Sequence, residues 1–395
     1  MKVELNSNRT MVGIPFYDAE GEEVLEACLS DVDRALNNLG VDAQIVVGIN
    51  GPMTCRGYEP LSQSINRSKY NASVRFIKTL PGQVAALNQL ACHGVDMQCE
   101  RIFLTDADIS RLPDSLGAMW TEGSKPLVGA RYSAYPIELM MDAGIEISDE
   151  EAGLIEIFEA DKHPSVRRYV SDLRPKNRVK GSLMLVDINY AQSMHGDQKV
   201  TPDSRMNFNI GQTDRQIVDR AGFMHYPRTS LTDHIQARVR HFRAASAEGR
   251  LDIQYRKELF PSPCQVESIA EQIIFDDPTA LKEVSNLLLR SALRQEVAGI
   301  CRDIADDSFT EWWGQRFSNE ETDLNTLVHS FQEAQCRICR LLRNVNWHDL
   351  DSAASNGHGT TQSSKSRIPI NLEPYMKNIN YRRMIFSYLG VEEDK

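Results

Sequence analysis

The pattern that most constrains the fold is a strand, a helix and a second strand near the start of the chain. Residues 11–17 are almost wholly apolar and precede a polar turn, which predicts a short buried strand. Residues 22–39 place apolar side chains on one side of a helix, and Gly40 predicts its end. Residues 41–49 contain a second apolar run. Because the connections are short, this order predicts parallel strands and an α/β fold.

Two carboxylates follow the predicted strand at residues 101–105, which carries three consecutive apolar residues before Asp106 and Asp108. On an extended chain, residues i and i+2 project to the same side. Open α/β sheets bind ligands at the carboxyl ends of their strands. Two neighbouring oxygen ligands suit Mg²⁺ or Mn²⁺ that also contacts a diphosphate. A turn that caps the next helix, or stays solvated, explains the same residues without a metal.

The residues upstream connect this pattern to a known family. A strand is predicted at 74–79, and the run 80–91 begins with Pro-Gly and continues as a helix that contains Ala-Leu-Asn. The order of strand, glycine turn, Ala-Leu-Asn helix, strand and Asp-Ala-Asp resembles the nucleotide-sugar-binding half of the GT-A inverting glycosyltransferases, a large family of bacterial sugar transferases. The resemblance covers roughly residues 10–245. It implies a Rossmann-like mixed sheet flanked by helices, followed here by a mostly helical C-terminal region.

The resemblance implies a donor site and a metal site. Asp108 is implied as the direct ligand of Mg²⁺ or Mn²⁺, with Asp106 reaching the ribose, or the metal through water. Relatives read the base with an acidic residue where this chain has Asn50. Packing at a sheet edge explains Tyr17 equally well, and a plain helix start explains Gly82. The residues assigned to nucleotide-sugar binding are Pro15, Tyr17, Glu20, Asn50, Gly82, Asn88, Asp106, Arg238 and Arg240.

The same resemblance implies a catalytic base. Relatives carry Glu-Asp at the start of a helix, and Thr213-Asp214 holds that place, followed by Arg-Ala-Gly and an aromatic residue. We therefore expect a helix over 213–222 with Asp214 as the base, and Asp203 or Asp219 as the alternatives. A carboxylate that simply favours a helix N-terminus explains Asp214 as well.

Basic residues follow the predicted helix, where relatives carry Gln-x-x-Arg-Trp. The chain has Gln236 and two arginines in this region, without the Trp. Arg238 and Arg240 are expected to hold the diphosphate, since a guanidinium fork matches phosphate oxygens. His234 is the candidate third metal ligand or phosphate partner, against a histidine that is merely solvated.

Composition excludes several partners. A net charge of −11 and a pI near 5.4 argue against nucleic acid and against electrostatic docking on an anionic membrane. The start of the chain lacks the apolar core of a secretory signal, and no run approaches the roughly 18 apolar residues of a membrane span. The 8 cysteines show no framework spacing, which favours free thiols in a cytoplasmic protein.

The pattern along the chain predicts its domains. The helical C-terminal region is where a homo-oligomer could form. The tail after it is expected to dock back, because its apolar side chains would be costly to expose. We predict a GT-A domain at 1–250 (nucleotide-sugar half 10–135, acceptor half 136–250), a helical domain at 251–351, a flexible linker at 352–368 and a docking tail at 369–395.

The function expected from this reading is a soluble, metal-dependent, hexosyltransferase-type enzyme. It would move a sugar, with inversion, from a nucleotide diphosphate sugar to the hydroxyl of a small molecule, glycan or protein. One alternative is a sugar-phosphate nucleotidyltransferase, although the turn at 18–21 is acidic where that class carries basic residues. The other is a non-catalytic interaction protein with a decayed transferase domain, which the departures at Asn50 and Thr213 and the missing Trp keep open.

Overall fold

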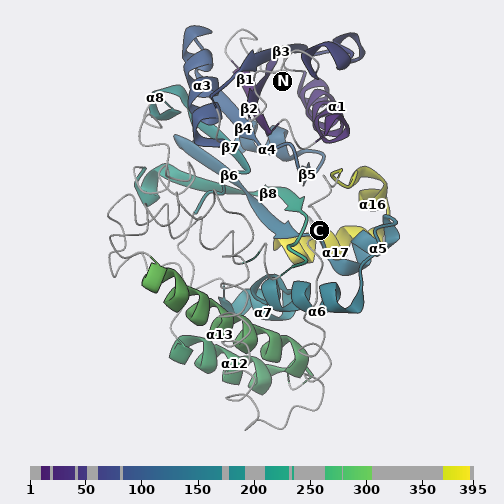
Figure 1. Cartoon of the computed structure of the whole chain (residues 1–395), viewed down its shortest axis with the longest axis vertical. Helices are drawn as coiled ribbons and strands as arrows, with labels where there is room; N and C mark the ends of the chain where they lie inside the picture. Colours follow the sequence, from purple (N-terminus) through teal and green to yellow (C-terminus); the bar gives the residue numbers. More distant parts are fainter. Residues whose placement is uncertain are drawn as a thin grey trace. The chain divides into compact units, whose positions relative to one another are not determined.

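The computed structural model describes residues 10–17, 21–40, 43–50, 61–80, 83–170, 178–191, 210–230, 234, 263–277, 279–304 and 368–391 (Figure 1). The strands are β1 (Thr10–Tyr17), β2 (Gln44–Asn50), β3 (Ser73–Lys78), β4 (Arg101–Thr105), β5 (Ile109–Arg111), β6 (Leu127–Ala134), β7 (Leu183–Asp187) and β8 (Arg215–His225). The α-helices are α1 (Glu22–Leu39), α3 (Gln83–Asp96), α4 (Ser115–Glu122), α5 (Ile137–Asp142), α6 (Asp149–Phe158), α7 (Pro164–Val170), α8 (Ile188–Ala191), α12 (Pro263–Asp276), α13 (Leu281–Ile304), α16 (Glu373–Lys377) and α17 (Ile379–Leu389). Short 3₁₀ helices are η2 (Arg67–Lys69), η3 (Ala160–Lys162) and η6 (Gln212–Asp214).

The described strands form one mixed sheet in the order β3-β2-β1-β4-β7-β6-β8-β5. The first four strands in this order run parallel, and β7 pairs antiparallel with both β4 and β6. At the far edge β8 is parallel to β6, and β5 is antiparallel to β8. The predicted strand-helix-strand unit is β1-α1-β2, and the strand predicted at 101–105 is β4. A mixed sheet flanked by helices confirms the predicted α/β class.

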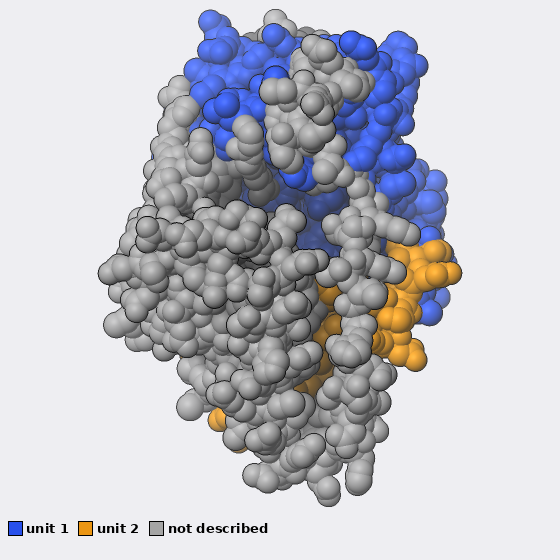
Figure 2. Space-filling view, viewed as in Figure 1, with its two compact units in different colours: residues 1–143, 176–226, 363–395 blue, residues 144–175, 227–362 orange. Residues whose placement is uncertain are grey.

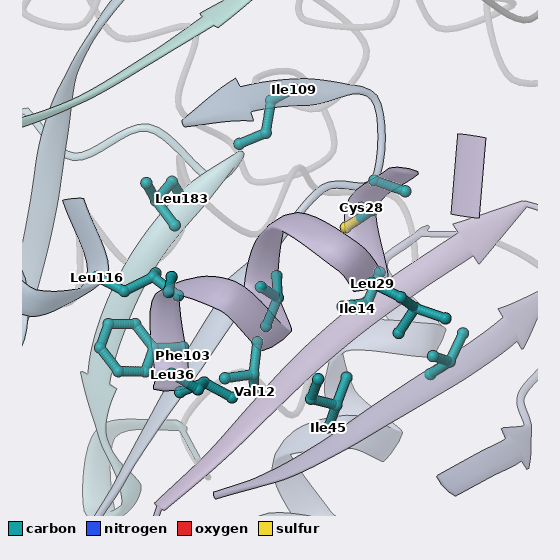
Figure 3. Close-up of a cluster of buried hydrophobic side chains, with 14 of the residues drawn as sticks. Val12, Ile14, Cys28, Leu29, Leu36, Ile45, Phe103, Ile109, Leu116 and Leu183 are labelled. Atoms are coloured by element: carbon teal, nitrogen blue, oxygen red, sulfur yellow. The ribbon is translucent and has the colours of Figure 1, made fainter. Parts of the chain in front are cut away.

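Helices cover both faces of the parallel strands. On one face, Leu29 and Leu36 of α1 pack with Val12 and Ile14 of β1 in the larger hydrophobic cluster (Figure 3). On the other face, Leu90 of α3 lies in a second cluster with alternate residues of the same strands. Because side chains in a strand alternate between faces, nearly continuous apolar strands of this kind are buried on both sides.

The ends of α1 follow from its sequence. Glu22 and Glu23 occupy the first turn, where carboxylates interact favourably with the helix dipole. Gly40 ends the helix in the left-handed region, at φ 64°, and its N–H donates to the carbonyl of Asn37. A residue without Cβ adopts this conformation at little cost, so the predicted helix end is confirmed.

The prediction of a helix over residues 213–222 is wrong. Residues 212–214 form a single 3₁₀ turn, and Arg215 begins β8, which continues to His225. The pairing of β8 with β6 shifts register after Val218, so residues 219–221 form an irregular bulge. The bulge places buried Val218 and Ala221 three positions apart, which is the spacing that an amphipathic helix would show.

The chain divides into two compact units, and each unit is built from separate stretches of sequence (Figure 2). The predicted boundary near residue 250 does not separate them, because residues of the expected acceptor half, 136–250, contribute to both. Unit 1 comprises residues 1–143, 176–226 and 363–395, and unit 2 comprises residues 144–175 and 227–362.

The C-terminal segment, residues 368–391, packs within unit 1. Ile385 and Leu389 of α17 are fully buried, and Ile370 and Leu372 are nearly so. Ile379, at the start of the same helix, is 42% exposed, so the helix buries one side only. The segment thus contributes buried apolar side chains to unit 1.

Polar contacts also hold the C-terminal segment. The Ile370 N–H donates to Tyr135 Oη at 3.3 Å, and the Ile370 carbonyl accepts a hydrogen bond from Ser110 Oγ. Ser110 and Tyr135 are hydrogen-bonded to each other, so the three residues close a ring in which each buried polar group has a partner. Glu373 of α16 forms an ion pair with Arg34 of α1 at 2.6 Å.

Unit 2 is helical in its described residues. Its core joins α7 to α12 and α13 through residues such as Val166, Ile273 and Leu287. Arg290 of α13 forms a buried ion pair with Asp161 of η3. Among the described residues of the whole chain, no helix combines the length and apolar character of a membrane span.

Candidate functional site

The candidate site lies at the carboxyl edge of the parallel strands. β4 ends at Thr105, and residues 106–108 form the turn that leads into β5. Ala107 is 2% exposed and belongs to the larger hydrophobic cluster, whereas Asp106 is half-buried and Asp108 is exposed. Burial therefore alternates through the turn and leaves both carboxylates outside the core, at the edge where such sheets bind ligands.

The backbone of Asp106 is fixed on both sides. Its N–H donates to the carbonyl of Ser182, just before β7, at 2.9 Å, and its own carbonyl accepts from Arg111 Nη2 at 3.0 Å. Arg111 of β5 also donates to Thr105 Oγ1 from Nη2 at 2.6 Å and from Nε at 3.1 Å. Arg111 Nη1 lies 2.8 Å from Asp31 Oδ2 of α1. The turn is thus held from β7 and β5.

The charges around the turn are unevenly compensated. Burial opposes the charge on Arg111, but Cys28 and Asp31 hold the pKa of Arg111 above its ordinary value. Although the Asp108 side chain reaches solvent, the surrounding protein removes part of its hydration and raises its pKa, opposed by a backbone hydrogen bond and by Arg111. A carboxylate whose negative charge is disfavoured in this way would be stabilised by a bound cation.

The predicted nucleotide wall lies along the same edge. Tyr17 pairs with Asn50 across β1 and β2, and the Tyr17 side chain is 39% exposed. Asn50 is buried, and its Nδ2 donates to the carbonyl of Phe16 at 3.0 Å, so this amide ties the two strand ends together. Pro15, two positions inside β1, is buried. Of these predicted residues, Tyr17 has the side chain most available to a ligand.

Of the other residues predicted to bind the nucleotide sugar, the structure describes only Asn88. Asn88 lies on α3, and its Oδ1 is buried without a partner among the described residues. Glu20, Gly82, Arg238 and Arg240 lie outside the described residues.

Asp214 and Asp108 lie at opposite ends of the strands of the sheet. It precedes β8, whose other end, His225, pairs with Ile109, the residue after Asp108. β8 has 11 residues, and a strand of that length spans roughly 30 Å. At this separation Asp214 would not reach a group held at Asp108, so a base at Asp214 does not fit a donor site at the Asp106–Asp108 turn.

Neither alternative base, Asp203 or Asp219, is placed by the structure beside the Asp106–Asp108 turn. Asp203 lies outside the described residues. Asp219 lies in the bulge of β8, where its exposed carboxylate forms an ion pair with Arg131. That position is on the strand between the two sheet edges rather than beside the Asp106–Asp108 turn.

His234, the expected third metal ligand, belongs to unit 2. Its ring is 2% exposed and stacks on Phe158 of α6, with the ring centroids 4.1 Å apart. Among the described residues, no group of three or more His, Cys, Asp or Glu side chains is placed to hold a metal ion. A metal at Asp106 and Asp108 would therefore take its remaining ligands from a diphosphate, from water or from elsewhere in the chain.

The sequence did not indicate Arg111 as part of the site. A single arginine three positions after Asp108 resembles an ordinary surface residue, but its side chain is only 2% exposed. The one available signal is that it follows two apolar or small residues at the start of a strand, where a charge needs a buried partner.

No protein-family model and no curated protein sequence matches the chain. Among solved structures it is similar to HddC from Yersinia pseudotuberculosis, with TM-score 0.34 and 9% identity over 54% of this chain and 92% of that one. It is similar to mannosyl-3-phosphoglycerate synthase from Rubrobacter xylanophilus, with TM-score 0.34 and 13% identity over 62% and 76% of the two chains. For the inositol-1-phosphate CTP transferase from T. maritima, the TM-score is 0.34 and the identity 12%, over 58% and 92%. At such low TM-scores these likenesses carry no argument about function.

Proposed function

We propose that the chain is a metal-dependent inverting glycosyltransferase that takes its sugar from a nucleotide diphosphate sugar. The observation that carries the proposal is the pair of carboxylates Asp106 and Asp108, held outside the core where β4 ends. The order of strand, Pro-Gly helix and strand that precedes these carboxylates in the sequence supports it as well.

The two carboxylates would hold Mg²⁺ or Mn²⁺. When bound, such a cation neutralises the diphosphate as it leaves the sugar. Mg²⁺ in proteins is commonly held by one or two carboxylates, with substrate phosphates and water as its other ligands. Two carboxylates therefore match the protein ligands that such an ion needs. The ring of Tyr17 is partly exposed at the end of the neighbouring strand β1, and it would contact the nucleotide base.

The test is metal-dependent binding of nucleoside diphosphates. A ligand bound only by the native state raises apparent stability, by about 2.7 kcal/mol at 100 times its Kd. We expect thermal stabilisation of the full chain by a nucleoside diphosphate with Mn²⁺, and its loss in Asp108→Asn. Asp96→Asn is the matched control. Asp96 is an exposed carboxylate at the end of α3, close to the start of β4, whereas Asp108 follows the end of β4. Equal stabilisation of both variants would refute the site.

A second measurement separates the classes of reaction. A glycosyltransferase releases a nucleoside diphosphate from a nucleotide sugar, whereas a nucleotidyltransferase releases pyrophosphate from a nucleoside triphosphate and a sugar phosphate. We expect the first product and not the second when both substrate sets are supplied with Mn²⁺. Pyrophosphate release would assign the alternative enzyme class, and release of neither product would favour a non-catalytic protein.

A further inference from the structure

Arg111 closes the turn that carries both carboxylates. The chain leaves β4 at Thr105, passes through Asp106 and Asp108, and reaches Arg111 within six residues. The Arg111 guanidinium then hydrogen-bonds back to Thr105 Oγ1 and to the Asp106 carbonyl. The segment is thus fastened to its own beginning, and the two carboxylates lie between the fastened ends.

We infer that Arg111 is a positioning residue for the metal and the diphosphate, acting through the backbone of this turn. The inference rests on the proposed function of Asp106 and Asp108. Arg111 itself would touch neither ligand, because its side chain is 2% exposed and its guanidinium already donates to Thr105, Asp106 and Asp31.

A buried guanidinium is a costly way to fill space, so its contacts matter. An apolar residue of similar volume often stabilises a protein as well as a buried ion pair does. The guanidinium instead supplies donors in a fixed planar fork, which here meet a side-chain hydroxyl, a backbone carbonyl and the Asp31 carboxylate. Asp31 also pairs with Arg34 at 2.8 Å, so it remains paired when Arg111 is replaced.

The chain offers a matched control at the other end of β4. Arg101 also uses its guanidinium to hold backbone carbonyls, donating to Gly123 and to Lys125 at 2.8 Å each. It begins β4, whereas Arg111 braces the turn at the carboxyl end of that strand. Arg101→Met removes two guanidinium hydrogen bonds to backbone carbonyls, and Arg111→Met removes those to one backbone carbonyl, one hydroxyl and one carboxylate. Both changes delete a guanidinium that braces one end of β4, and only the second is next to the carboxylates.

The experiment is a Mn²⁺ titration of the full chain in the presence of a saturating nucleoside diphosphate, by calorimetry below the melting temperature of every variant. A misplacement of about 1 Å in a site can cost on the order of 100-fold. We expect Arg111→Met to weaken Mn²⁺ binding about tenfold or more and Arg101→Met about twofold or less. Arg111→Lys, which keeps the charge without the planar fork, should recover part of the affinity.

Thr105→Val provides a second route if Arg111→Met does not fold. It removes the hydroxyl that accepts two of the Arg111 hydrogen bonds and that donates, at 3.3 and 3.4 Å, to the Asp106 and Ser182 carbonyls. It keeps the shape of the side chain and leaves the Arg111 charge in place. We expect it to weaken Mn²⁺ binding severalfold, with a smaller change in melting temperature than Arg111→Met.

The possible failures are distinguishable. If the unsubstituted protein binds no nucleoside diphosphate with Mn²⁺, the proposed function fails, and the inference about Arg111 fails with it. If that protein binds but the Arg111 and Arg101 variants lose equal affinity, or Thr105→Val binds normally, the donor site stands and the positioning role is refuted.

Discussion

Leu389→Ala should destabilise the sheet of unit 1, although Leu389 lies far along the chain from every strand. Its side chain is 0% exposed, and a Cβ added at Gly222 of β8 would lie 2.8 Å from Leu389 Cδ1. Truncation to Ala removes three carbons, each worth about 0.8 kcal/mol on burial. The cavity left behind adds to this loss, so we expect about 3–5 kcal/mol.

Ile379→Ala is the matched control on the same helix. Ile379 is 42% exposed at the start of α17, so its truncation should cost less than about 1 kcal/mol. Alanine is the better helix former in both cases, which makes any difference between the variants a matter of packing.

The assay is amide hydrogen exchange of β5 and β8, read by mass spectrometry. A global unfolding curve is unsuitable, because two compact units need not unfold together. We expect Leu389→Ala to speed exchange in both strands while Ile379→Ala leaves it nearly unchanged. The same exchange rates in the two variants would show that the C-terminal segment does not stabilise the sheet.

Three further outcomes follow from the structure. Asp214→Asn should leave sugar transfer within about twofold, because Asp214 lies at the wrong sheet edge; a loss near 100-fold, the size of a general-base contribution, would contradict this placement. Arg290→Met should lower the stability of unit 2 by about 3–5 kcal/mol, because it removes the buried cation beside Asp161. Lys282→Met breaks an exposed ion pair on the same helix and should cost under about 1 kcal/mol, with both losses measured by amide exchange. Burial raises the pKa of Cys28, so iodoacetamide should label this thiol only after unfolding; labelling of the native protein at the rate of a free thiol would show it to be accessible.

The parallel half of the sheet could be predicted from the sequence because its strands are apolar on both faces. β1, β2 and β4 are continuous hydrophobic runs, and α1 between the first two has a clear apolar side and a glycine end. These signals are local, so tertiary structure had little to override. The Asp106–Asp108 pair could be placed for the same reason, since its position depends only on where β4 ends.

The far half of the sheet could not be predicted in the same way. The bulge in β8 breaks the alternation of buried and exposed side chains that identifies a strand. The buried residues of β8 are then spaced as they would be in a helix. The assignment of Asp214 as the base comes from the family resemblance, which also implies a helix at this place. β5 has three residues, too few for any periodic signal.

The buried polar residues of β5 depend on partners that are distant in sequence. Ser110 is satisfied by Tyr135 and Ile370, and Arg111 by Asp31 of α1. A local pattern would assign such polar residues to the surface, because it contains no information about these partners.

The hydrogen bond between Ser110 and Ile370 also has a consequence for synthesis of the chain. The two residues are 260 positions apart. At roughly 5–20 residues per second, a ribosome needs tens of seconds to travel from one to the other. Until residues 370–389 are made, β5 and later β8 have no Ile370 or Leu389 to cover them, and an exposed apolar face of this kind promotes aggregation. A product that ends before residue 370 would therefore leave this face of the sheet uncovered.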